Sequence, residues 1–289
     1  MTTLYFPITI TSSRKSIKLS GSAYLMRIDD TRCRKVLGIQ EVVLTETGSV
    51  SEVSHEDNAP WHTWMMYLRR NNPTHDLAVF QTNFLLSVSS RRQAILIGFA
   101  MKLLDGTRSG PFIGFSDMRT SQFTIQFLNL CPYWGGDFLS LGRAEIKILR
   151  TLVEQLERSH GDKRLDTVIE KFCYAESAGV PSTALRFLEL SVVLEMLFLP
   201  KATSELSYRF QLRVAKWFSR HYHEDVRVVT DHAKRIYALR SKIAHTGTAE
   251  VTDEDMNTIR RIARMALRKF VLKSSLFDDK YLDELCLAG

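Results

Sequence analysis

The sequence predicts an α+β fold, with a β-rich N-terminal domain at residues 1–143 and an all-α helical bundle at residues 144–289. Two observations predict it. Up to about Gly142, apolar residues occur in short runs that suit strands, and polar clusters with glycine and serine separate these runs. Beyond that point apolar residues recur every three or four positions, which is the period of an amphipathic helix. The change of period places the domain boundary near residues 140–145.

The N-terminal domain is predicted to be an antiparallel sheet or a sandwich. Its strands are expected at Leu4–Ile10, Ser16–Ile28, Lys35–Leu44, Leu77–Val88 and Ser121–Leu130. In the last of these, apolar and polar residues largely alternate, as on a strand with one buried face. The aromatic-rich segment Ala59–Asn72 suits either a helix or a further strand.

The C-terminal domain is predicted to be a bundle of helices, the last with a weaker pattern than the others. They are expected at Glu145–Ser159, Leu165–Ala178, Thr183–Leu199, Glu205–His221, Glu224–Ile243, Asp253–Ser274 and Asp278–Cys286. On the third helix an apolar stripe recurs every three or four residues, and we expect it to face the centre of the bundle. The stripe consists of Leu185, Leu188, Val192, Met196 and Leu199.

Composition indicates an ordinary soluble globular chain, since 45% of its 289 residues are hydrophobic and 25% are charged. The N-terminus lacks the pattern of a signal peptide. The longest apolar run, Ala94–Leu104, is interrupted by Lys102 and is too short to span a bilayer. We therefore expect a cytoplasmic protein that does not enter the membrane.

No metal site or cofactor is predicted. The four cysteines include no Cys-x-x-Cys pair, which argues against a zinc knuckle or a redox dithiol. The pair His221 and His223, even with His232 nearby, lacks the further ligands that a zinc site needs.

Charge favours an acidic partner, because the formal net charge is +7 and the sequence pI is about 9.2. Nucleic acid is the first candidate, and a solvated basic surface without a specific partner is the alternative. Two rows at helical spacing could follow a phosphate backbone, although a solvated helix face has the same pattern. They are Arg209, Arg213, Lys216 and Arg220 on one helix, and Arg260, Arg264 and Arg268 on another.

Arg240 lies near the end of the fifth predicted helix, and His245 follows two residues after its predicted last residue. A guanidinium binds phosphate, and an imidazole can gain or lose a proton near neutral pH, so the pair suits chemistry on a phosphodiester. Five residues turn an ideal helix by roughly 500°, so the two side chains would diverge by about 140°. Either the helix ends before His245, or each motif meets its counterpart on another helix or subunit.

Three further residues are candidates for supporting roles. Glu195 lies in an apolar stretch and needs a cationic or hydroxyl partner, which a structural salt bridge would also supply. Ser241 and Lys242 lie between the motif residues and could touch a phosphate. A surface lysine and a serine near a helix end need no such role.

The residues around the motif resemble a known family. Residues 235–247 read RIYALRSKIAHTG, which resembles the signature of the Apea-like HEPN family, a branch of the HEPN ribonuclease superfamily. Upstream, residues 190–197 read LSVVLEML and resemble the family's helix with an acidic residue between leucines, and residues 205–215 read ELSYRFQLRVA and resemble its next helix. The resemblance covers about residues 150–275. Thr246 stands where many members have glycine.

The resemblance implies a metal-independent endoribonuclease of the HEPN type. Members typically dimerise so that two Arg-x-x-x-x-His segments face each other in one cleft. By that analogy His245 acts as general acid or base, and Arg240 holds the scissile phosphate and stabilises its added charge. The 2′-hydroxyl of the RNA attacks and leaves a 2′,3′-cyclic phosphate, so DNA should resist cleavage.

The family's usual setting is prokaryotic defence against phages or a toxin–antitoxin pair. It implies a toxin or effector whose β-rich domain is a sensor or regulatory surface for a protein or a phage trigger. Two alternatives stay open. One is a non-catalytic HEPN module that binds RNA, a nucleotide or a partner protein. The other is a structural subunit whose helical domain mediates assembly.

Overall fold

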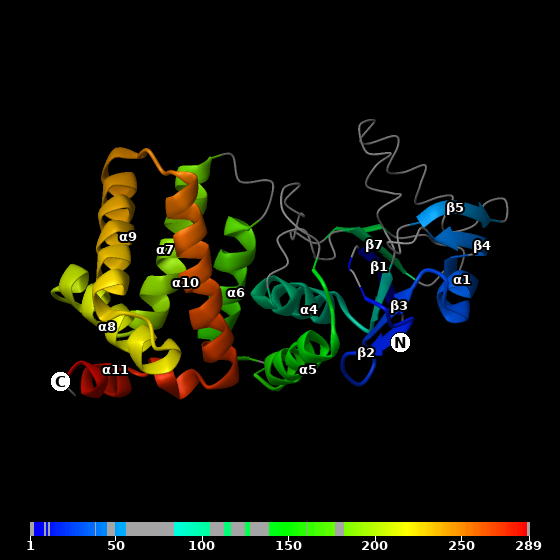
Figure 1. The fold of residues 1–289 in the computed structure, drawn as a ribbon, viewed down its shortest axis with the longest axis horizontal. Coiled ribbons are helices and arrows are strands. Elements are labelled where there is room, and N and C mark those ends of the chain that lie inside the picture. Colours follow the sequence, from blue (N-terminus) through cyan, green and yellow to red (C-terminus); the bar gives the residue numbers. More distant parts are fainter. Residues whose placement is uncertain are drawn as a thin grey trace. The chain divides into compact units, whose positions relative to one another are not determined.

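The chain divides into two compact units, Met1–Glu157 and Arg158–Gly289. The computed structural model describes residues 3–8, 10, 12–37, 39–44, 50–55, 84–104, 113–116, 125–127, 139–159, 161–176 and 182–287. Figure 1 traces both units along the chain from blue to red. The predicted order, an antiparallel sheet followed by a mostly helical region, is confirmed.

The N-terminal unit is built on a six-stranded antiparallel sheet with the order β2-β3-β6-β1-β7-β8. Its strands are β1 (Leu4–Ile8), β2 (Ser16–Lys18), β3 (Tyr24–Arg27), β6 (Phe84–Val88), β7 (Ile113–Ser116) and β8 (Ile125–Phe127). Two further strands, β4 (Ile39–Leu44) and β5 (Val50–His55), pair with each other in a separate antiparallel sheet. Strand β6 is buried at every position, as expected for an inner strand.

Two predicted strands differ from the structure. Ser16–Ile28 is not one strand, because the chain turns between β2 and β3, where the Leu19 N–H donates to the Ala23 carbonyl at 2.9 Å. Lys35–Leu44 is wrong at its start, because residues 35–37 belong to helix α1 (Thr31–Leu37). The predicted segment Ala59–Asn72 and parts of two predicted strands lie outside the described part of the chain. The parts of the strands concerned are residues 77–83, 121–124 and 128–130.

Helix α4 (Arg91–Leu104) was missed by the sequence prediction, in which Ala94–Leu104 figured only as an apolar run. Residues 96–103 are all buried, so no polar face marks the helical period. Among the residues that the structure describes, no helix is long and apolar enough to cross a membrane.

Helix α5 (Arg143–Arg158) forms where it was predicted, but contacts assign it to the first unit. Arg150 Nε donates to the Lys18 carbonyl at the end of β2 at 2.7 Å. Glu157 Oε1 accepts hydrogen bonds from Ser20 Oγ at 2.8 Å and from Gln93 Nε2, on α4, at 2.7 Å. The border between the units therefore follows Glu157 and lies beyond the predicted boundary.

The C-terminal unit is a bundle whose helices begin and end within a few residues of the predicted bounds. They are α6 (Lys163–Ala175), α7 (Thr183–Phe198), α8 (Leu206–Tyr222), α9 (Val226–Thr246), α10 (Asp253–Leu272) and α11 (Asp279–Leu287), with a 3-10 turn η1 (Ser274–Phe277) before the last. Helices α6, α7, α9 and α10 begin at the N-cap side chains of Asp162, Ser182, Asp225 and Thr252, each of which accepts a hydrogen bond from a backbone N–H of the first turn.

Helix α7 lies at the centre of the bundle and packs against α6, α9 and α10 (Figure 1). The face that it buries is not the predicted stripe. Leu185 is 38% exposed, and the other four stripe residues are only half-buried. The apolar side chains that it buries are Phe187, Leu190, Val193, Leu194, Leu197 and Phe198. Because α7 is apolar on nearly all sides, a spacing of three to four residues fits more than one of its faces.

Candidate functional site

Helix α9 carries the Arg240 and His245 motif and runs unbroken through both residues. Its buried face consists of Val229, Ala233, Ile236, Leu239 and Ile243. The helix ends at Gly247, which adopts the left-handed conformation (φ 74°) and whose N–H donates to the Ile243 carbonyl at 2.8 Å. The idea that the helix ends before His245 is therefore wrong, because the terminating glycine comes two residues later.

Arg240 forms an ion pair with Glu195 of α7. Arg240 Nε lies 2.8 Å from Glu195 Oε1, and Arg240 Nη2 donates to Glu195 Oε2 at 2.9 Å. The two side chains are 31% and 20% exposed, so the pair is partly screened from water. The expectation that Glu195 needs a cationic partner is confirmed, and that partner is the arginine of the motif.

His245 lies in the last turn of α9 and is exposed. Lys242 is exposed one turn before it, and Ser241, next to Arg240, is half-buried. Because α9 is continuous, Arg240 and His245 point about 140° apart around its axis and are separated by roughly 7.5 Å along it. Within one chain the structure brings Glu195 to Arg240, and it leaves His245 on another side of the helix.

A second ion pair joins the middle of α9 to the first turn of α10. Arg235 donates from Nε and Nη2 to the two carboxylate oxygens of Asp255, at 3.0 Å each. Asp255 also closes the capping box of α10 with Thr252. The hydrogen bond from Arg235 is the main reason that the pKa of Asp255 falls to about 2. The spacing of Thr252 and Asp255 is a capping-box signal in the sequence, but it does not indicate the contact with Arg235.

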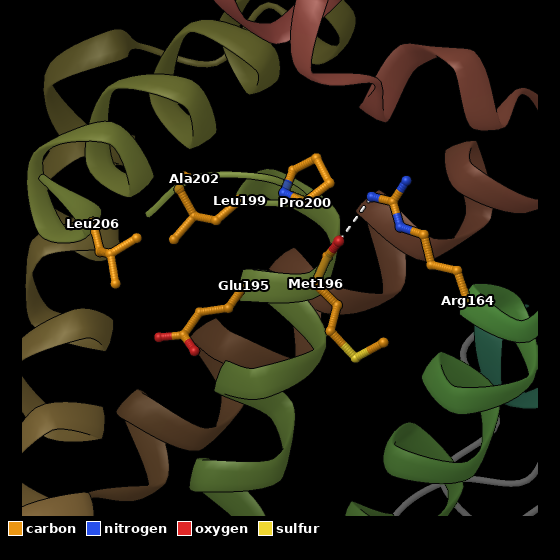
Figure 2. A pocket seen from close by; sticks show the side chains of 7 residues that line it. All are labelled: Arg164, Glu195, Met196, Leu199, Pro200, Ala202 and Leu206. Atoms are coloured by element: carbon orange, nitrogen blue, oxygen red, sulfur yellow. Dashed lines mark hydrogen bonds between the residues drawn. The ribbon is translucent and has the colours of Figure 1, made fainter. Parts of the chain in front are cut away.

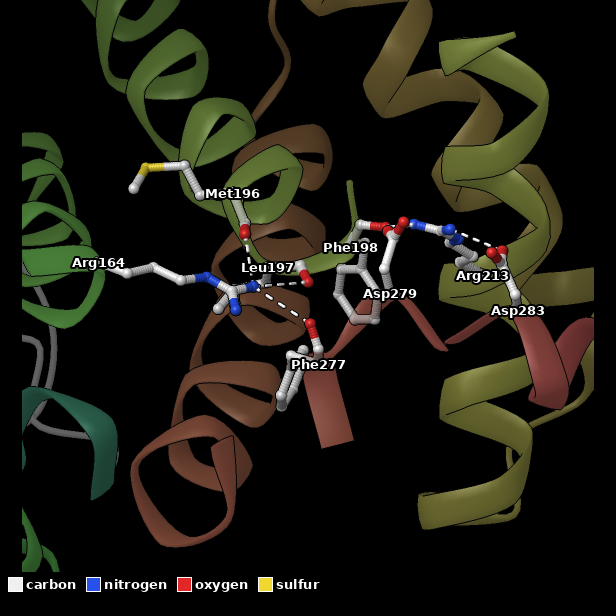
Figure 3. Close-up of polar contacts among 8 residues, drawn as sticks. All are labelled: Arg164, Met196, Leu197, Phe198, Arg213, Phe277, Asp279 and Asp283. Atoms are coloured by element: carbon white, nitrogen blue, oxygen red, sulfur yellow. Dashed lines mark hydrogen bonds and ion pairs between the residues drawn. The ribbon is translucent and has the colours of Figure 1, made fainter. Parts of the chain in front are cut away.

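The predicted basic row on α8 does not form one surface. Arg213 is 1% exposed. Its Nη1 donates to the Phe198 carbonyl at 2.8 Å and to Asp279 at 2.9 Å, and its Nη2 donates to Asp283 at 2.6 Å. The proposal that Arg213 binds RNA is therefore wrong, because the guanidinium lies in the bundle and joins α7, α8 and α11 (Figure 3). The other members of the row are less buried: Arg209 and Lys216 are half-buried, and Arg220 is exposed.

The basic row on α10 is also engaged within the bundle. Arg260 Nε donates to Glu176 Oε1 at 2.9 Å, and Arg264 Nη2 lies 3.5 Å from Glu176 Oε2. Glu176 is buried, and the side chains of Arg260 and Arg264 are only 17% and 13% exposed. Arg268, the third member, is half-buried. Arg260 and Arg264 therefore neutralise the buried carboxylate of Glu176, and they do not form an open face that could bind phosphate.

The histidines near the motif helix lie apart in different settings. His221 Nε2 lies 2.9 Å from the Tyr281 hydroxyl, and its ring packs against Trp217. The pKa of His221 is lowered mainly by burial and, to a smaller extent, by nearby positive charges. His223 follows α8 in the left-handed conformation, and His232 is half-buried on α9. Among the described residues, no three His, Cys, Asp or Glu side chains group to hold a metal ion.

A pocket of about 360 Å³ has Glu195, the partner of Arg240, among its lining residues. Figure 2 shows the side chains that line it. It is lined by Arg164, Glu195, Met196, Leu199, Pro200, Ala202 and Leu206. In Figure 2 the Glu195 carboxylate lies below Ala202 and Leu206, and Arg164 borders the other end near Pro200. The sequence does not reveal this pocket, because its walls come from α6, α7, α8 and the connection between α7 and α8.

Arg164 closes one end of the pocket and also caps α7. Its Nη2 donates to the carbonyls of Met196 at 2.7 Å, Leu197 at 3.2 Å and Phe277 at 3.3 Å (Figure 3). The guanidinium also lies 5.0 Å from the centre of the Phe270 ring. Burial lowers the pKa of Arg164, and nearby aspartates partly oppose this effect. A cation at the C-terminal end of a helix is favourable because the helix dipole is negative there.

Comparisons of the chain with protein-family models, with curated proteins and with solved structures found no match.

Proposed function

We propose that the C-terminal unit is a metal-independent endoribonuclease of the HEPN type, which cuts RNA at a site composed of Arg240 and His245 from two copies of the chain. The observation that carries the proposal is the position of the two residues on α9. Arg240 is held by Glu195 and is partly exposed, and His245 is exposed in the last turn. Both types of side chain that phosphodiester cleavage needs are therefore present at one end of one helix.

The continuous helix is the reason for involving a second copy. Side chains about 140° apart on one helix cannot both approach a phosphate from the same direction. A twofold arrangement of two α9 helices removes this difficulty, because the arginine of one chain can face the histidine of the other. Each chain then supplies one half of each of two equivalent sites.

The reaction follows from the chemistry of the two side chains. An imidazole takes the proton of the RNA 2′-hydroxyl, and the 2′-oxygen attacks the adjacent phosphorus. The bond from phosphorus to the 5′-oxygen breaks, and that oxygen receives a proton from an imidazolium. The products are a 2′,3′-cyclic phosphate and a 5′-hydroxyl. His245 carries the proton, and Arg240 stabilises the negative charge that builds up on the phosphate oxygens.

Glu195 acts in this scheme as a positioning residue. Its carboxylate lies against Nε and Nη2 of Arg240, which fixes the plane of the guanidinium. Among the described residues, the contacts of Arg240 use Nε and Nη2, so Nη1 and the second hydrogen of Nη2 can donate to phosphate oxygens. Fixing a guanidinium before the substrate arrives reduces the entropy that is lost when it binds.

The test is cleavage of RNA by the purified full-length chain in EDTA, with DNA of the same sequence as a second substrate. We expect RNA to be cut to products with 2′,3′-cyclic phosphate ends, and DNA to stay intact. His245→Ala should reduce the rate by about 10²–10⁴-fold, which is the usual contribution of general acid–base catalysis. Arg240→Ala should reduce it by about 10²–10³-fold.

His232→Ala is the matched control, because it removes a histidine from the same helix outside the motif. This variant should cut RNA at the rate of the unmodified chain. Equal rates for the His245→Ala and His232→Ala variants would reject His245 as the catalytic group. Loss of cleavage on addition of EDTA would reject the metal-independent reaction.

A non-catalytic module that binds RNA, a nucleotide or a partner protein is the second candidate. The observation that favours it is the Arg240 ion pair, because a guanidinium already neutralised by Glu195 can serve stability alone. Under this function the chain would bind RNA without cutting it, and His245→Ala would leave the affinity unchanged.

The proposed biological role is that of a toxin or effector in prokaryotic anti-phage defence, with the N-terminal unit as its sensor or regulatory surface. An unregulated ribonuclease harms the cell that makes it. Induced expression in a bacterium should therefore arrest growth, and the His245→Ala variant should not. Arrest of equal strength by both would contradict this role.

A further inference from the structure

The outer face of the β2–β3 hairpin, in the first unit, carries positive charge that the proposed ribonuclease site does not use. Along β2, Ile17 is buried, so Ser16 and Lys18 on either side of it face outward. Lys18 lies directly opposite Tyr24 in the register of the two strands. Side chains at opposite positions of an antiparallel pair share one face, so Tyr24, which is half-buried, lies beside the exposed Lys18.

Two cations lie against the ring of Tyr24. Lys18 Nζ is 5.8 Å from the ring centre, and the guanidinium carbon of Arg32 is 6.0 Å from it. Arg32 belongs to the first turn of α1, which packs against β3 (Figure 1). Its Nη2 donates to Ser16 Oγ at 2.8 Å. These contacts hold an ammonium and a guanidinium together on a small area of the hairpin.

Further cations lie along β2. Arg14, just before the strand, is exposed, and Arg150 of α5 donates from Nε to the Lys18 carbonyl at 2.7 Å. Residues 12–40 contain seven Lys or Arg side chains and two acidic ones, so the segment that forms the hairpin and α1 is strongly basic. We call this area the β2 surface, and it consists of Arg14, Ser16, Lys18, Tyr24, Arg32 and Arg150.

The two acidic residues of this segment leave the β2 surface positive. Asp29 is bound by Arg27, which donates from Nε and Nη2 to its two oxygens at 2.6 and 2.7 Å. Asp30 accepts from Arg32 Nε at 3.4 Å, a long contact with a side chain that is 60% exposed. Among the described residues, the Lys18 ammonium has no ion-pair partner. A polyanion can therefore approach Lys18 and Arg32 together.

A phosphate backbone matches the groups of the β2 surface. Arg and Lys side chains, together with Ser and Tyr hydroxyls, make most protein contacts to nucleic-acid phosphates. A cation–π contact at an exposed site is weaker than a charge-assisted hydrogen bond, so a phosphate can draw Lys18 away from the ring of Tyr24. The ring face that this uncovers can then stack on a base, as in proteins that bind single strands.

Other polyanions match the β2 surface less well. An acidic protein offers carboxylates, but it has no base that could stack on Tyr24. Binding to a membrane surface also buries apolar side chains. Among the described residues of the first unit, the exposed large apolar side chains are Val43 on β4 and Ile148 on α5, which lie outside the hairpin.

We propose that the β2 surface binds the backbone of a single RNA strand, with Lys18 and Arg32 on phosphates and the ring of Tyr24 against a base. Binding does not depend on base sequence, because phosphate contacts and stacking are common to all four nucleotides. The surface belongs to the first unit, whereas Arg240 and His245 belong to the second. Its effect on cleavage rests on the proposed ribonuclease function, and RNA binding does not.

The charged contacts are tested by fluorescence anisotropy with a labelled oligouridylate at several salt concentrations. The full-length His245→Ala chain is used, so that the RNA stays intact. Replacing Lys18 and Arg32 together by alanine should weaken binding. It should also make the slope of log K against log salt shallower by about 1.4, because each phosphate contact with a single strand contributes about 0.7.

Replacing Lys163 and Lys280 together by alanine is the matched control, because it removes the same charge from exposed positions of the helical unit. This control should keep the affinity and the salt slope of the parent chain. Equal losses in the two double variants, or a salt slope that the loss of Lys18 and Arg32 leaves unchanged, would overturn the proposal. Circular dichroism and the melting temperature check that both variants are folded.

Tyr24 gives a readout that charge alone does not affect. Tyr24→Leu keeps an apolar side chain and removes the ring, so the affinity should fall about fivefold or more while the salt slope stays the same. Tyr24→Phe keeps the ring and should bind like the parent chain. Equal affinities of the two variants, or competition by polyglutamate as strong as by unlabelled RNA at equal charge, would reject the single strand as the partner.

Cleavage of a long RNA by chains that keep His245 separates this proposal from the ribonuclease itself. A higher KM with an unchanged kcat, when Lys18 and Arg32 are both replaced by alanine, supports both proposals. Binding that depends on the β2 surface, without any cleavage, supports the surface and rejects the ribonuclease. Cleavage with an unchanged KM, together with binding that the double variant does not weaken, supports the ribonuclease and rejects the surface.

Discussion

Replacement of Arg213 by methionine tests whether this arginine stabilises the bundle, as its contacts indicate. Methionine keeps an unbranched apolar stem and removes the guanidinium. The Phe198 carbonyl would lose its hydrogen bond in a buried position, which costs about 1–3 kcal/mol. Asp279 and Asp283 would lose their partner, but they are 26% and 48% exposed and can be hydrated, so each adds at most about 0.5 kcal/mol.

One contribution to the stability of this variant has the opposite sign. Arg213 Nε is buried and has no hydrogen-bond partner among the described residues, so removal of the guanidinium relieves part of its desolvation cost. The expected net loss of stability is therefore about 2 kcal/mol, below the 3–5 kcal/mol for a fully buried pair. For a unit of this size, that loss lowers the melting temperature by roughly 6–8 °C.

The assay is thermal unfolding followed by circular dichroism at a helical wavelength, with Arg220→Met as the matched control. Arg220 lies on the same helix and in the same predicted row, but it is exposed, so its replacement should change the stability by less than about 0.5 kcal/mol. At a temperature where both variants are folded, Arg213→Met should keep its RNA affinity. Equal melting temperatures for the two variants, together with weaker RNA binding by Arg213→Met, would refute the structural role.

Three further predictions concern the bundle. A double-mutant cycle of Glu195→Ala and Arg240→Ala should give a coupling of about 1 kcal/mol in urea unfolding, and strictly additive effects would contradict the partly buried ion pair. The pKa of Asp255 falls to about 2 when the chain folds, so the contact with Arg235 stabilises the protein above about pH 4. This stabilisation is lost as the pH falls toward 2. An Asp255→Asn variant should lack it at neutral pH, and its size after solvent screening is about 1 kcal/mol. Folding lowers the pKa of His221, so protonation favours the unfolded chain, and the stability should fall as the pH drops below about 6.5. His221→Phe should weaken this pH dependence of the stability. The same pH profile in both chains would exclude a contribution of His221.

The sequence predicted the bounds of helices in the C-terminal unit well because local signals mark them. Asp225 is the N-cap and Gly247 the C-cap of α9, and Thr252 is the N-cap of α10. These signals act within a few residues of one another and can be read without tertiary information. In the N-terminal unit the apolar run of α4 carries no such period, because the helix is buried on nearly every side. Patterns therefore identified the long helices of the C-terminal unit, but they missed the buried helix α4, the short helix α1 and the strands β5 and β7.

The candidate site was predictable in its residues more than in its contacts. The apolar surroundings of Glu195 indicated that it needs a cationic or hydroxyl partner, and in the structure this partner is Arg240. The basic rows were misleading, because Arg213 and Arg260 have the spacing of an exposed face but pair with carboxylates on other helices or connections. Sequence spacing shows which residues share a helix face, and only the tertiary structure shows whether that face is open.

Helix α7 shows how one ambiguity in the sequence hid the pocket. The stripe that ends at Met196 and Leu199 satisfied the helical period, so it was assigned to the core. The bundle instead buries the face that contains Leu194 and Leu197, and leaves Met196 and Leu199 to line a pocket. The number of apolar residues on a central helix is therefore worth comparing with the number that its neighbours bury. When a helix has more apolar positions than its neighbours cover, those left over are where a ligand with an apolar face can bind.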